Sequence, residues 1–479
     1  MYDAAVNPGD PMDDLLHRPL SEILDRLARK EITPVDLMER TLARIGKLNP
    51  SLNAFCELAD EGELYDQARA AEKRWQAGEA RALEGIPLGV KELEDAEGFH
   101  ATHGSVPFKD RMAERDSVQV ERLKAAGAIV VGKTNAPEFG YTCITKNLIH
   151  GVTKSPWNLD ISPGGSSGGS SAAIAGGMIP LVTASDGGGS IRLPASFTGC
   201  FGLKSSQGRI PNAPFDTWET TDTVVVGPPT RTVEDAAIHL DVVAGPHPLD
   251  PKSLPHPGYA YRDILRGLPS GLRIALSRDL GFGVVQSDVA DVVAEAAQAF
   301  VELGHTVEEI SGGPPELGRQ WGLINAFDAA GLLSPLLPER EEEFGRSFIH
   351  GVNAGFKMTP EIWQAGQAAR QQLVEWCAGV FADYDLLLTP TTFADPPPAK
   401  GPLPMEVEGK RAPWGSSGAF TIPFNLSWNP AASVRAGFSK AGLPVGLQIV
   451  APRHRDDLVL QASWAYEQAR PWAEDWPNL

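Results

Sequence analysis

Two glycine- and serine-rich clusters contain the residues of this 479-residue chain that are best suited to chemistry. The first, GGSSGG, covers residues 164–169, and the second, DGGGS, covers residues 186–190. Serine hydroxyls act as nucleophiles when a base activates them, and glycines leave room for a substrate beside the backbone. Neither cluster is followed by the lysine that completes a nucleotide-binding loop. The pattern therefore favours attack of a serine on a carbonyl group over phosphate binding.

The second cluster can supply both a nucleophile and donors for a developing negative charge. Consecutive backbone N–H groups in a glycine-rich turn form an anion-binding nest, and the Ser190 hydroxyl would lie beside it. The first cluster can bring a second hydroxyl toward Ser190, and the residues leave open whether Ser166 or Ser167 provides it. Such clusters also serve as turns and helix caps, which is the structural alternative. The candidate donors are the backbone N–H groups of Gly187, Gly188, Gly189 and Ser190.

A hydroxyl nucleophile also needs a base, and Lys91 is the candidate. It closes the apolar run GIPLGVK of residues 85–91, so we expect it at the end of a buried strand. Desolvation disfavours the charged ammonium, and a neutral lysine amine accepts a proton. The alternative is a solvated charge at a strand end. His100 and His103 are interpreted as loop residues without a third metal ligand, and we expect no metal and no organic cofactor.

Apolar runs that alternate with helical patterns predict the elements that would position these residues. Ahead of them, Thr33 and Asp36 flank Pro34 as a helix cap would, and a second helix is expected over 60–78. The alternation after residue 85 predicts an α/β fold around a largely buried sheet. Strands are predicted within residues 85–91, 117–135 (after a helix), 177–186, 271–277, 383–390 and 442–452, and a helix over 288–304.

Composition and charge exclude several classes of function. The chain is 42% hydrophobic, carries a formal net charge of -19, and contains four cysteines with no CxxC pair. An acidic chain is a poor match for nucleic acid or an anionic membrane, so we expect neither as a partner. The acidic first residues lack the apolar core of a signal peptide, and no run has the length of a membrane span. We therefore expect a cytoplasmic protein with reduced thiols.

Several segments together resemble the amidase signature family of serine hydrolases, over about residues 20–470. The resemblance implies the family's α/β fold, a mixed, largely parallel β-sheet covered on both faces by helices. It favours a single domain over residues 1–479, with a helical layer (1–80), a signature core (81–240) and a C-terminal part with pocket-forming loops (241–479). The matching segments are GIPLGVKE (85–92), AGAIVVGKTNAPEFG (126–140), the stretches 162–211 and 424–467, and LLLTPTTFADPPP (386–398).

The resemblance assigns a role to each candidate residue. Ser190 matches the family's nucleophile, Ser166 matches the serine that bridges to the base, and Lys91 matches the base. The spacing between the two serines equals that of the family, in which the bridging serine follows a cis peptide bond, here Gly165–Ser166. The N–H groups of residues 187–190 match the oxyanion donors. The implied reaction passes through a covalent acyl-enzyme.

Two further residues match supporting positions of the family, and a third is expected to have a local role. Asp186 and Arg192 flank the nucleophile and are expected to position its loop, with a purely structural ion pair as the alternative. Ser167 is expected to hydrogen-bond locally. The chain departs from the family pattern at Glu92, where aspartate is frequent, and in its DGGGS form. That form resembles the branch of aryl acylamidases, nylon-oligomer cyclic dimer hydrolases and metagenomic urethanases.

The resemblance implies an amidohydrolase of aryl or alkyl amides, anilides included, and of carbamates. A nylon-type amide oligomer hydrolase is one alternative. The amidase component of a tRNA-dependent amidotransferase is another, although Leu193 stands where such proteins usually have glutamine. We expect a small-molecule amide or carbamate as partner and a monomer or homodimer. The expected pocket residues, for which core packing is the alternative, are Tyr141, Thr145, Phe215, Trp218, Trp321 and Phe327.

Overall fold

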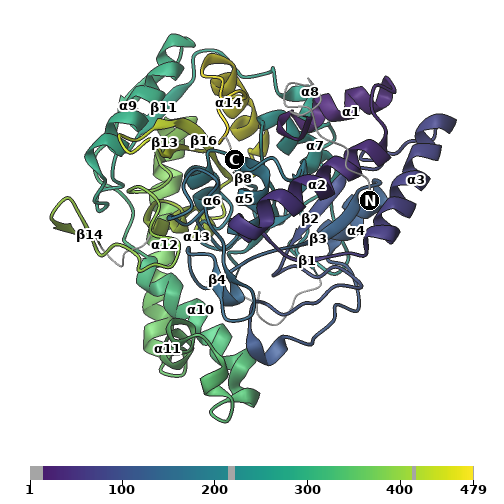
Figure 1. Cartoon of the computed structure of the whole chain (residues 1–479). Helices are drawn as coiled ribbons and strands as arrows, with labels where there is room; N and C mark the ends of the chain where they lie inside the picture. The colour runs from purple at the N-terminus through teal and green to yellow at the C-terminus, as the bar shows by residue number, and fades with distance from the viewer. Residues whose placement is uncertain (1–14, 214–221, 413–416, 478) are drawn as a thin grey trace.

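The computed structural model describes residues 15–213, 222–412, 417–477 and 479, and its helices and strands alternate as expected for an α/β protein (Figure 1). The helices are α1 (Leu20–Ala28), α2 (Pro34–Leu52), α3 (Glu61–Ala77), α4 (Val118–Ala125), α5 (Gly168–Ala175), α6 (Arg192–Thr198), α7 (Val233–Val243), α8 (Tyr261–Ile264), α9 (Ser287–Glu302), α10 (Gly318–Leu333), α11 (Arg346–Gly355), α12 (Pro360–Asp383), α13 (Ile422–Leu426) and α14 (Asp456–Ala469). The strands are β1 (Phe55–Leu58), β2 (Pro87–Lys91), β3 (Ile129–Thr134), β4 (Lys146–Asn147), β5 (Gly151–Val152), β6 (Leu181–Val182), β7 (Ala184–Asp186), β8 (Phe201–Lys204), β9 (Val225–Gly227), β10 (Pro229–Thr230), β11 (Arg273–Leu276), β12 (Thr306–Glu309), β13 (Leu386–Pro390), β14 (Glu406–Val407), β15 (Lys410–Arg411), β16 (Ala431–Phe438) and β17 (Pro444–Val450).

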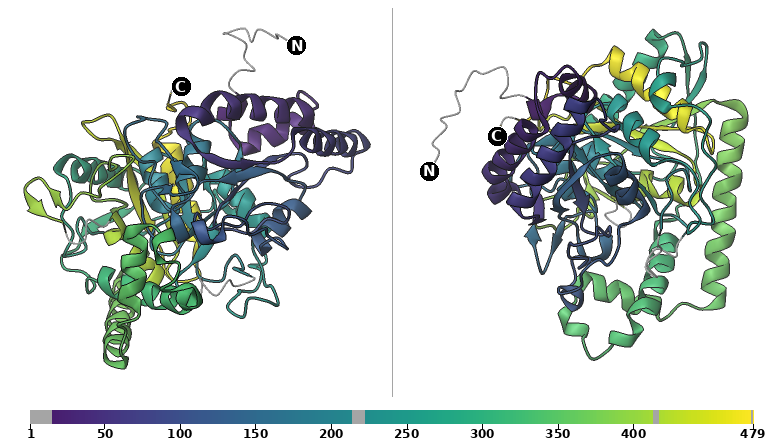
Figure 2. Two further views of the ribbon diagram at one scale, coloured as in Figure 1. Left: turned by 60° about the horizontal axis from the view of Figure 1, so that its bottom comes forward. Right: turned by 90° about the vertical axis from the view of Figure 1, so that its right-hand side faces the viewer.

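The N-terminal helices α1, α2 and α3 gather on one side of the molecule (Figure 2). Helix α2 begins as the sequence predicts. The Thr33 hydroxyl accepts a hydrogen bond from the Asp36 N–H at 3.0 Å, and the Asp36 carboxylate accepts one from the Thr33 N–H at 2.9 Å. This capping box and Pro34 in the first turn satisfy the helix start.

Two larger sheets carry the core. One has the strand order β1-β3-β2-β6, and the other has the order β10-β8-β16-β17-β13-β11-β12. Parallel pairs join β2 to β3 and β6, and β11 to β12 and β13, whereas the other pairs of both sheets are antiparallel. The predicted strand within 177–186 is divided between β6 and β7, which pair with different partners.

Helices cover both faces of the larger sheet, as the resemblance implies. On β16, Ala432 and Val434 belong to the same apolar cluster as Val293 of α9 and Leu460 of α14. Ser433 lies between them in sequence and points to the opposite face, because successive side chains of a strand alternate. There the sheet packs against α6, and Gly446 of β17 permits the close approach, since a Cβ at this position would lie 2.6 Å from Ser196 Oγ.

A buried histidine gives the fold a testable pH dependence. His239 of α7 is fully buried, and neither of its ring nitrogens has a hydrogen-bond partner among the described residues. Burial lowers the pKa of His239 to about 3. Between pH 6.5 and pH 3 the unfolded chain therefore binds more protons at this histidine, so the stability falls as the pH falls. We expect His239 to lower the free energy of unfolding by about 2 kcal/mol at pH 5 relative to pH 7.5.

Replacing His239 by leucine is expected to remove this contribution. Urea unfolding of His239→Leu and of the unmodified protein at pH 5 and pH 7.5 measures it. The matched control is His350→Leu on α11, because His350 is exposed. An unchanged pH dependence in His239→Leu would contradict the prediction.

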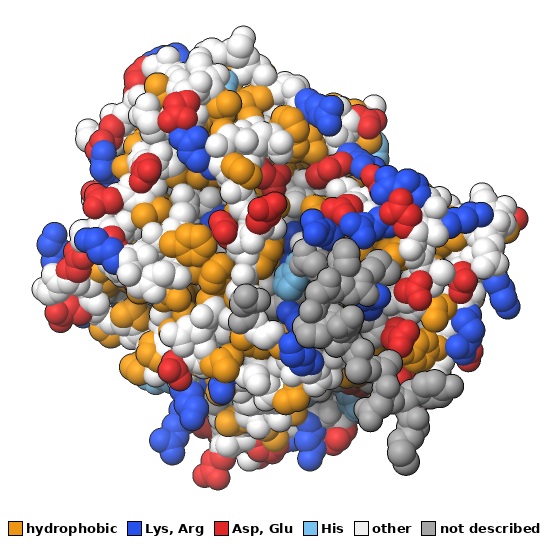
Figure 3. All heavy atoms as spheres, turned by 45° about the horizontal axis from the view of Figure 1, so that its top comes forward, with side chains coloured by type: hydrophobic (Ala, Val, Ile, Leu, Met, Phe, Trp, Pro, Cys, Tyr) orange, Lys and Arg blue, Asp and Glu red, His pale blue; other side chains and the backbone are white. Residues whose placement is uncertain are grey.

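Acidic and basic side chains are interspersed with apolar ones on the face shown in Figure 3. Within the part of the chain that the structure describes, no helix combines the length and apolar character needed to cross a bilayer.

Candidate active site

Lys91 lies at the carboxyl end of β2, a strand that is buried along its whole length. Its Nζ lies within hydrogen-bond distance of the Ser166 hydroxyl, at 2.8 Å, and of the Ser185 hydroxyl, at 2.9 Å. The prediction of a buried strand end is confirmed, and the alternative of a solvated surface charge is wrong. The sequence did not indicate that Ser185 contacts Lys91. The only feature that could have drawn attention to Ser185 was its position directly before Asp186.

Ser166 connects Lys91 to a cavity. The Ser166 hydroxyl lies within reach of the lysine, and Ser166 lines the cavity together with Ser190. The peptide bond between Gly165 and Ser166 is cis, as the resemblance implied. Gly164 has a positive φ of 90°, and a Cβ there would lie 2.8 Å from the Pro194 backbone, so a glycine is required.

Ser167 joins the two clusters at their backbones. Its N–H donates to the Ser190 carbonyl at 3.3 Å, and its hydroxyl donates to the Ser185 carbonyl at 3.2 Å. Ser166 lines the cavity, and Ser167 makes local hydrogen bonds.

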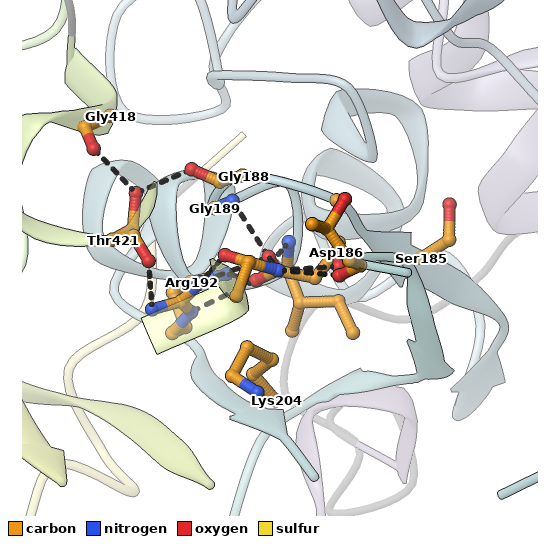
Figure 4. A network of polar contacts seen from close by, with 12 residues as sticks. Ser185, Asp186, Gly188, Gly189, Arg192, Lys204, Gly418 and Thr421 are labelled. Atoms are coloured by element: carbon orange, nitrogen blue, oxygen red, sulfur yellow. Dashed lines mark hydrogen bonds and ion pairs between the residues drawn. The ribbon is translucent and has the colours of Figure 1, made fainter. Parts of the chain in front are cut away.

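A buried ion pair shapes the loop that carries Ser190 (Figure 4). Arg192 donates to both carboxylate oxygens of Asp186, through Nε and Nη2, each at 2.9 Å. The same carboxylate accepts the N–H of Gly189 at 2.6 Å and the N–H of Ile191 at 3.2 Å. Burial opposes ionisation of Asp186, but Arg192 outweighs it and holds the pKa of the carboxyl well below its usual range. The carboxylate thus links the buried ion pair to the backbone of the loop at Gly189 and Ile191.

Residues of the C-terminal part complete this network. Nη1 of Arg192 donates to the Thr421 carbonyl at 3.0 Å and to Gln448 Oε1 at 2.7 Å. The Asn425 amide donates to the Asp186 carbonyl at 2.8 Å. These three partners were missed. Asn425 and Gln448 fall inside the resembling stretch 424–467, yet nothing local in that stretch links them to residues more than 200 positions earlier.

One predicted oxyanion donor is wrong. The N–H of Gly189 is bound to Asp186 Oδ1 and so cannot point at a substrate. Gly189 has a φ of 132°, and a Cβ there would lie 2.2 Å from Thr421 Oγ1, which donates to the Gly188 carbonyl at 2.6 Å. The glycine is needed for this turn. The other three predicted donors belong to residues that line the cavity, namely Gly187, Gly188 and Ser190.

Aromatic and apolar side chains form the walls of this cavity. Tyr141 and Trp321 line it as predicted. Further apolar lining comes from Leu93, Phe139, Ala213, Val224 and Val226, and polar lining comes from Glu94, Asp95, His103, Ser117, Asn212 and Asn325.

Two of the expected pocket residues lie elsewhere. Thr145 is fully buried and donates to the Gly164 carbonyl at 2.7 Å, so it supports the backbone before Ser166 and does not line the cavity. Phe327 is 45% exposed and lies against Trp363 of α12, outside the lining. Helix α10, which carries Phe327, has apolar side chains on several faces, so its sequence pattern does not select the face that turns inward. The two remaining expected residues, Phe215 and Trp218, lie outside the described residues.

Trp321 is expected to hold the backbone of Gly187 in place at the cavity. Its Nε1 donates to the Gly187 carbonyl at 2.9 Å, and its ring fills the space beside Gly188, where a Cβ would lie 2.6 Å away. Trp321→Phe keeps an aromatic ring but removes this hydrogen bond. We expect kcat to fall about threefold to tenfold, because this change in rate corresponds to the net free energy of one hydrogen bond. Steady-state kinetics on an amide substrate measures it.

The control is Trp363→Phe, because Trp363 lies on α12 outside the cavity lining. Its kcat is expected to stay within about twofold of the unmodified protein. Equal rates for both variants would contradict a positioning role of Trp321.

Comparisons with known proteins identify the family of this chain. A family model described as Amidase matches residues 36–460. An acylamidase of Rhodococcus erythropolis is 35% identical, over 95% of this chain and 96% of the relative. A glutamyl-tRNA(Gln) amidotransferase component of Geotalea daltonii is 33% identical, over 96% of this chain and 98% of the relative.

Solved structures give the same picture. A bacterial aryl acylamidase of the amidase signature family superimposes with a TM-score of 0.90 at 30% identity, covering 95% of this chain and 97% of that one. A 6-aminohexanoate cyclic dimer hydrolase superimposes with a TM-score of 0.86 at 29% identity, covering 97% and 99%. The chain belongs to the amidase signature family. It is a hydrolase that acts on carbon–nitrogen bonds.

Proposed function

We propose that the protein hydrolyses aryl and alkyl amides, anilides included, and also carbamates, with Ser190 as nucleophile, Ser166 as relay and Lys91 as base. One observation carries the proposal. Lys91 Nζ lies 2.8 Å from the Ser166 hydroxyl, and Ser166 shares a cavity with Ser190. This arrangement leads from a buried base, through one hydroxyl, to the wall on which a substrate would bind.

The reaction follows from this arrangement in two halves. Neutral Lys91 takes the proton of Ser166 while Ser166 takes the proton of Ser190, and the Ser190 oxygen bonds to the substrate carbonyl carbon. The carbonyl electron pair moves to oxygen, where the N–H groups of Gly187, Gly188 and Ser190 are the proposed donors. When this pair returns, the carbon–nitrogen bond breaks and the nitrogen takes the proton back through Ser166. Water then releases the acyl group by the same steps.

The walls of the cavity favour flat or apolar substrates. Tyr141, Phe139 and Trp321 present aromatic surface to the same space as the two serines. The similarity to an acylamidase and to an aryl acylamidase supports anilides as a substrate class. Carbamates share the planar carbonyl–nitrogen unit, and attack on them would leave an alkoxycarbonyl group on Ser190.

Two alternatives have an observation in their favour. Similarity to a 6-aminohexanoate cyclic dimer hydrolase supports hydrolysis of nylon-type amide oligomers by the same site. Similarity to a glutamyl-tRNA(Gln) amidotransferase component supports a role within a tRNA-dependent assembly that uses glutamine. The first differs only in substrate, whereas the second would require a partner protein.

Matched substrates distinguish these functions. We would measure amine release from a 4-nitroanilide, from the corresponding aryl carbamate and from a linear 6-aminohexanoate dimer, and ammonia release from glutamine. The unmodified protein and Ser190→Ala are compared on each. Release from the anilide and the carbamate that disappears in Ser190→Ala supports the proposal. Turnover of glutamine alone would overturn it in favour of the amidotransferase role, and turnover of the dimer alone would favour the oligomer hydrolase.

A further inference from the structure

A second group of chemically reactive side chains lies beside β2, outside the cavity lining. Cys56 belongs to β1, Glu92 directly follows β2, and His150 lies between β4 and β5. The sulfur, a carboxylate oxygen and a ring nitrogen of these residues all lie within 4.8 Å of one another. Cys56 Sγ and Glu92 Oε2 are 3.8 Å apart. The proposed hydrolysis uses none of the three.

Neighbouring groups already orient the Glu92 carboxylate. Its Oε1 accepts hydrogen bonds from the N–H of Thr102 at 2.9 Å and from the Thr102 hydroxyl at 2.5 Å. The other oxygen, Oε2, is the one that faces Cys56. The Thr102 hydroxyl also lies 3.5 Å from Nε2 of His150. Outer groups of this kind hold metal ligands in place in proteins, and here they leave one oxygen available to a cation.

The charges around the group suit a divalent cation. Glu92 is buried, and a second carboxylate, Glu57, lies on β1 beside Cys56 and contacts His100 at 2.8 Å. The nearby Lys133 ammonium, whose charge opposes a cation, donates to the Glu94 backbone carbonyl. Burial and the Glu92 carboxylate raise the pKa of the Cys56 thiol, so a bound cation must replace its proton.

The group is also within reach of solvent. His150 lines a surface groove together with Asn53, Leu58 and Lys154. Cys56 and His150 are half-buried, whereas Glu92 is buried. A cation can therefore enter past His150, and a water molecule can complete four-coordination from the groove.

We propose that Cys56, Glu92 and His150 form a binding site for Zn²⁺ or a similarly soft divalent cation. One thiolate, one imidazole and one carboxylate are ligand types that zinc accepts together. An occupied site would tie β1 and the β4–β5 connection to the residue that follows Lys91. The proposal is independent of the proposed hydrolysis, because it is tested by metal binding alone.

Cobalt provides the test, because a thiolate bound to Co²⁺ gives a charge-transfer band in the near ultraviolet. The full chain is treated with a chelator, desalted and titrated with Co²⁺. We expect one equivalent to produce the band and Zn²⁺ to abolish it. Cys56→Ser should lose the band, and His150→Ala should weaken binding about 10-fold to 100-fold or more. Cys143→Ser is the matched control, since Cys143 is also half-buried but lies outside the group, and it should keep the band.

A thermal readout guards against a variant that fails to fold. Zn²⁺ should raise the midpoint of thermal unfolding in the unmodified protein and in Cys143→Ser, because a ligand that binds the native state stabilises it. At the same Zn²⁺ concentration the shift should be smaller in His150→Ala, which changes a partly exposed loop residue, because weaker binding stabilises the native state less. Absence of stoichiometric Co²⁺ binding, or a band that survives in Cys56→Ser, would overturn the proposal.

Discussion

Replacing Ser190 by alanine is expected to lower kcat for anilide hydrolysis by at least about 10⁴-fold, since no covalent acyl-enzyme can form. The loss should fall on kcat with little change in KM, because the cavity walls stay intact. Steady-state kinetics measures kcat and KM. Mass spectrometry of protein that is trapped during turnover detects the acyl-enzyme. The unmodified protein should gain the mass of one acyl group, and Ser190→Ala should not.

The matched control for this variant is Ser171→Ala. Ser171 belongs to the same serine-rich segment, but it is fully buried on α5 and its hydroxyl has no hydrogen-bond partner among the described residues. Its activity should stay within about twofold of the unmodified protein. Retention of normal hydrolysis by Ser190→Ala would show that another group attacks the substrate.

Replacing Lys91 by methionine is expected to lower kcat/KM by about 10³-fold, the middle of the range for loss of a general base. Methionine keeps the length and apolar stem of lysine but cannot take the proton of Ser166. In the proposed mechanism the base must be unprotonated, so kcat/KM of the unmodified protein should rise with pH, as is typical of general base catalysis. This rise should be absent in Lys91→Met. A pH profile of kcat/KM on the 4-nitroanilide measures it.

Two further variants sharpen this test. Lys91→Arg should not recover activity, because a guanidinium keeps its proton and cannot act as a base. Lys133→Met removes a buried lysine of the neighbouring strand β3 and is expected to lose less than about 10-fold. Thermal unfolding of each variant shows that it is folded. An unchanged rate in Lys91→Met at pH 8 would refute its role as base.

Local sequence patterns correctly predicted those helices and strands that are stabilised by interactions between residues close together in the sequence. The capping residues Thr33 and Asp36 with Pro34 predict the start of α2, and the apolar run that ends at Lys91 predicts β2. A helix cap depends on bonds between residues three positions apart, and a buried strand depends on its own apolar side chains. The same reasoning missed the division of residues 177–186 between two sheets, since the pairing partners are distant in sequence.

The active-site pattern was predictable for the same reason. Ser190 and the glycines before it lie in one short segment, and the resemblance to known amidases assigned Ser166 and Lys91 by their position within matching motifs. The sequence did not show whether the N–H of Gly189 is available to a substrate. In the folded protein this N–H donates to the Asp186 carboxylate, whose orientation depends on the tertiary structure. The prediction that Thr145 and Phe327 line the pocket was wrong, because the direction in which a side chain points depends on contacts with other elements.

The sequence by itself determined the α/β class, the family, and the residue types at the three proposed catalytic positions, since these depend on short patterns and motif spacing. Only the tertiary structure decided which groups meet. It brings Ser185 to Lys91, Trp321 to Gly187, and Asn425 to Asp186. It also gathers the proposed metal ligands from positions 56, 92 and 150. Hydrogen bonds and charges act over a few ångströms, so contacts between distant segments exist only after the chain has packed its strands and helices together.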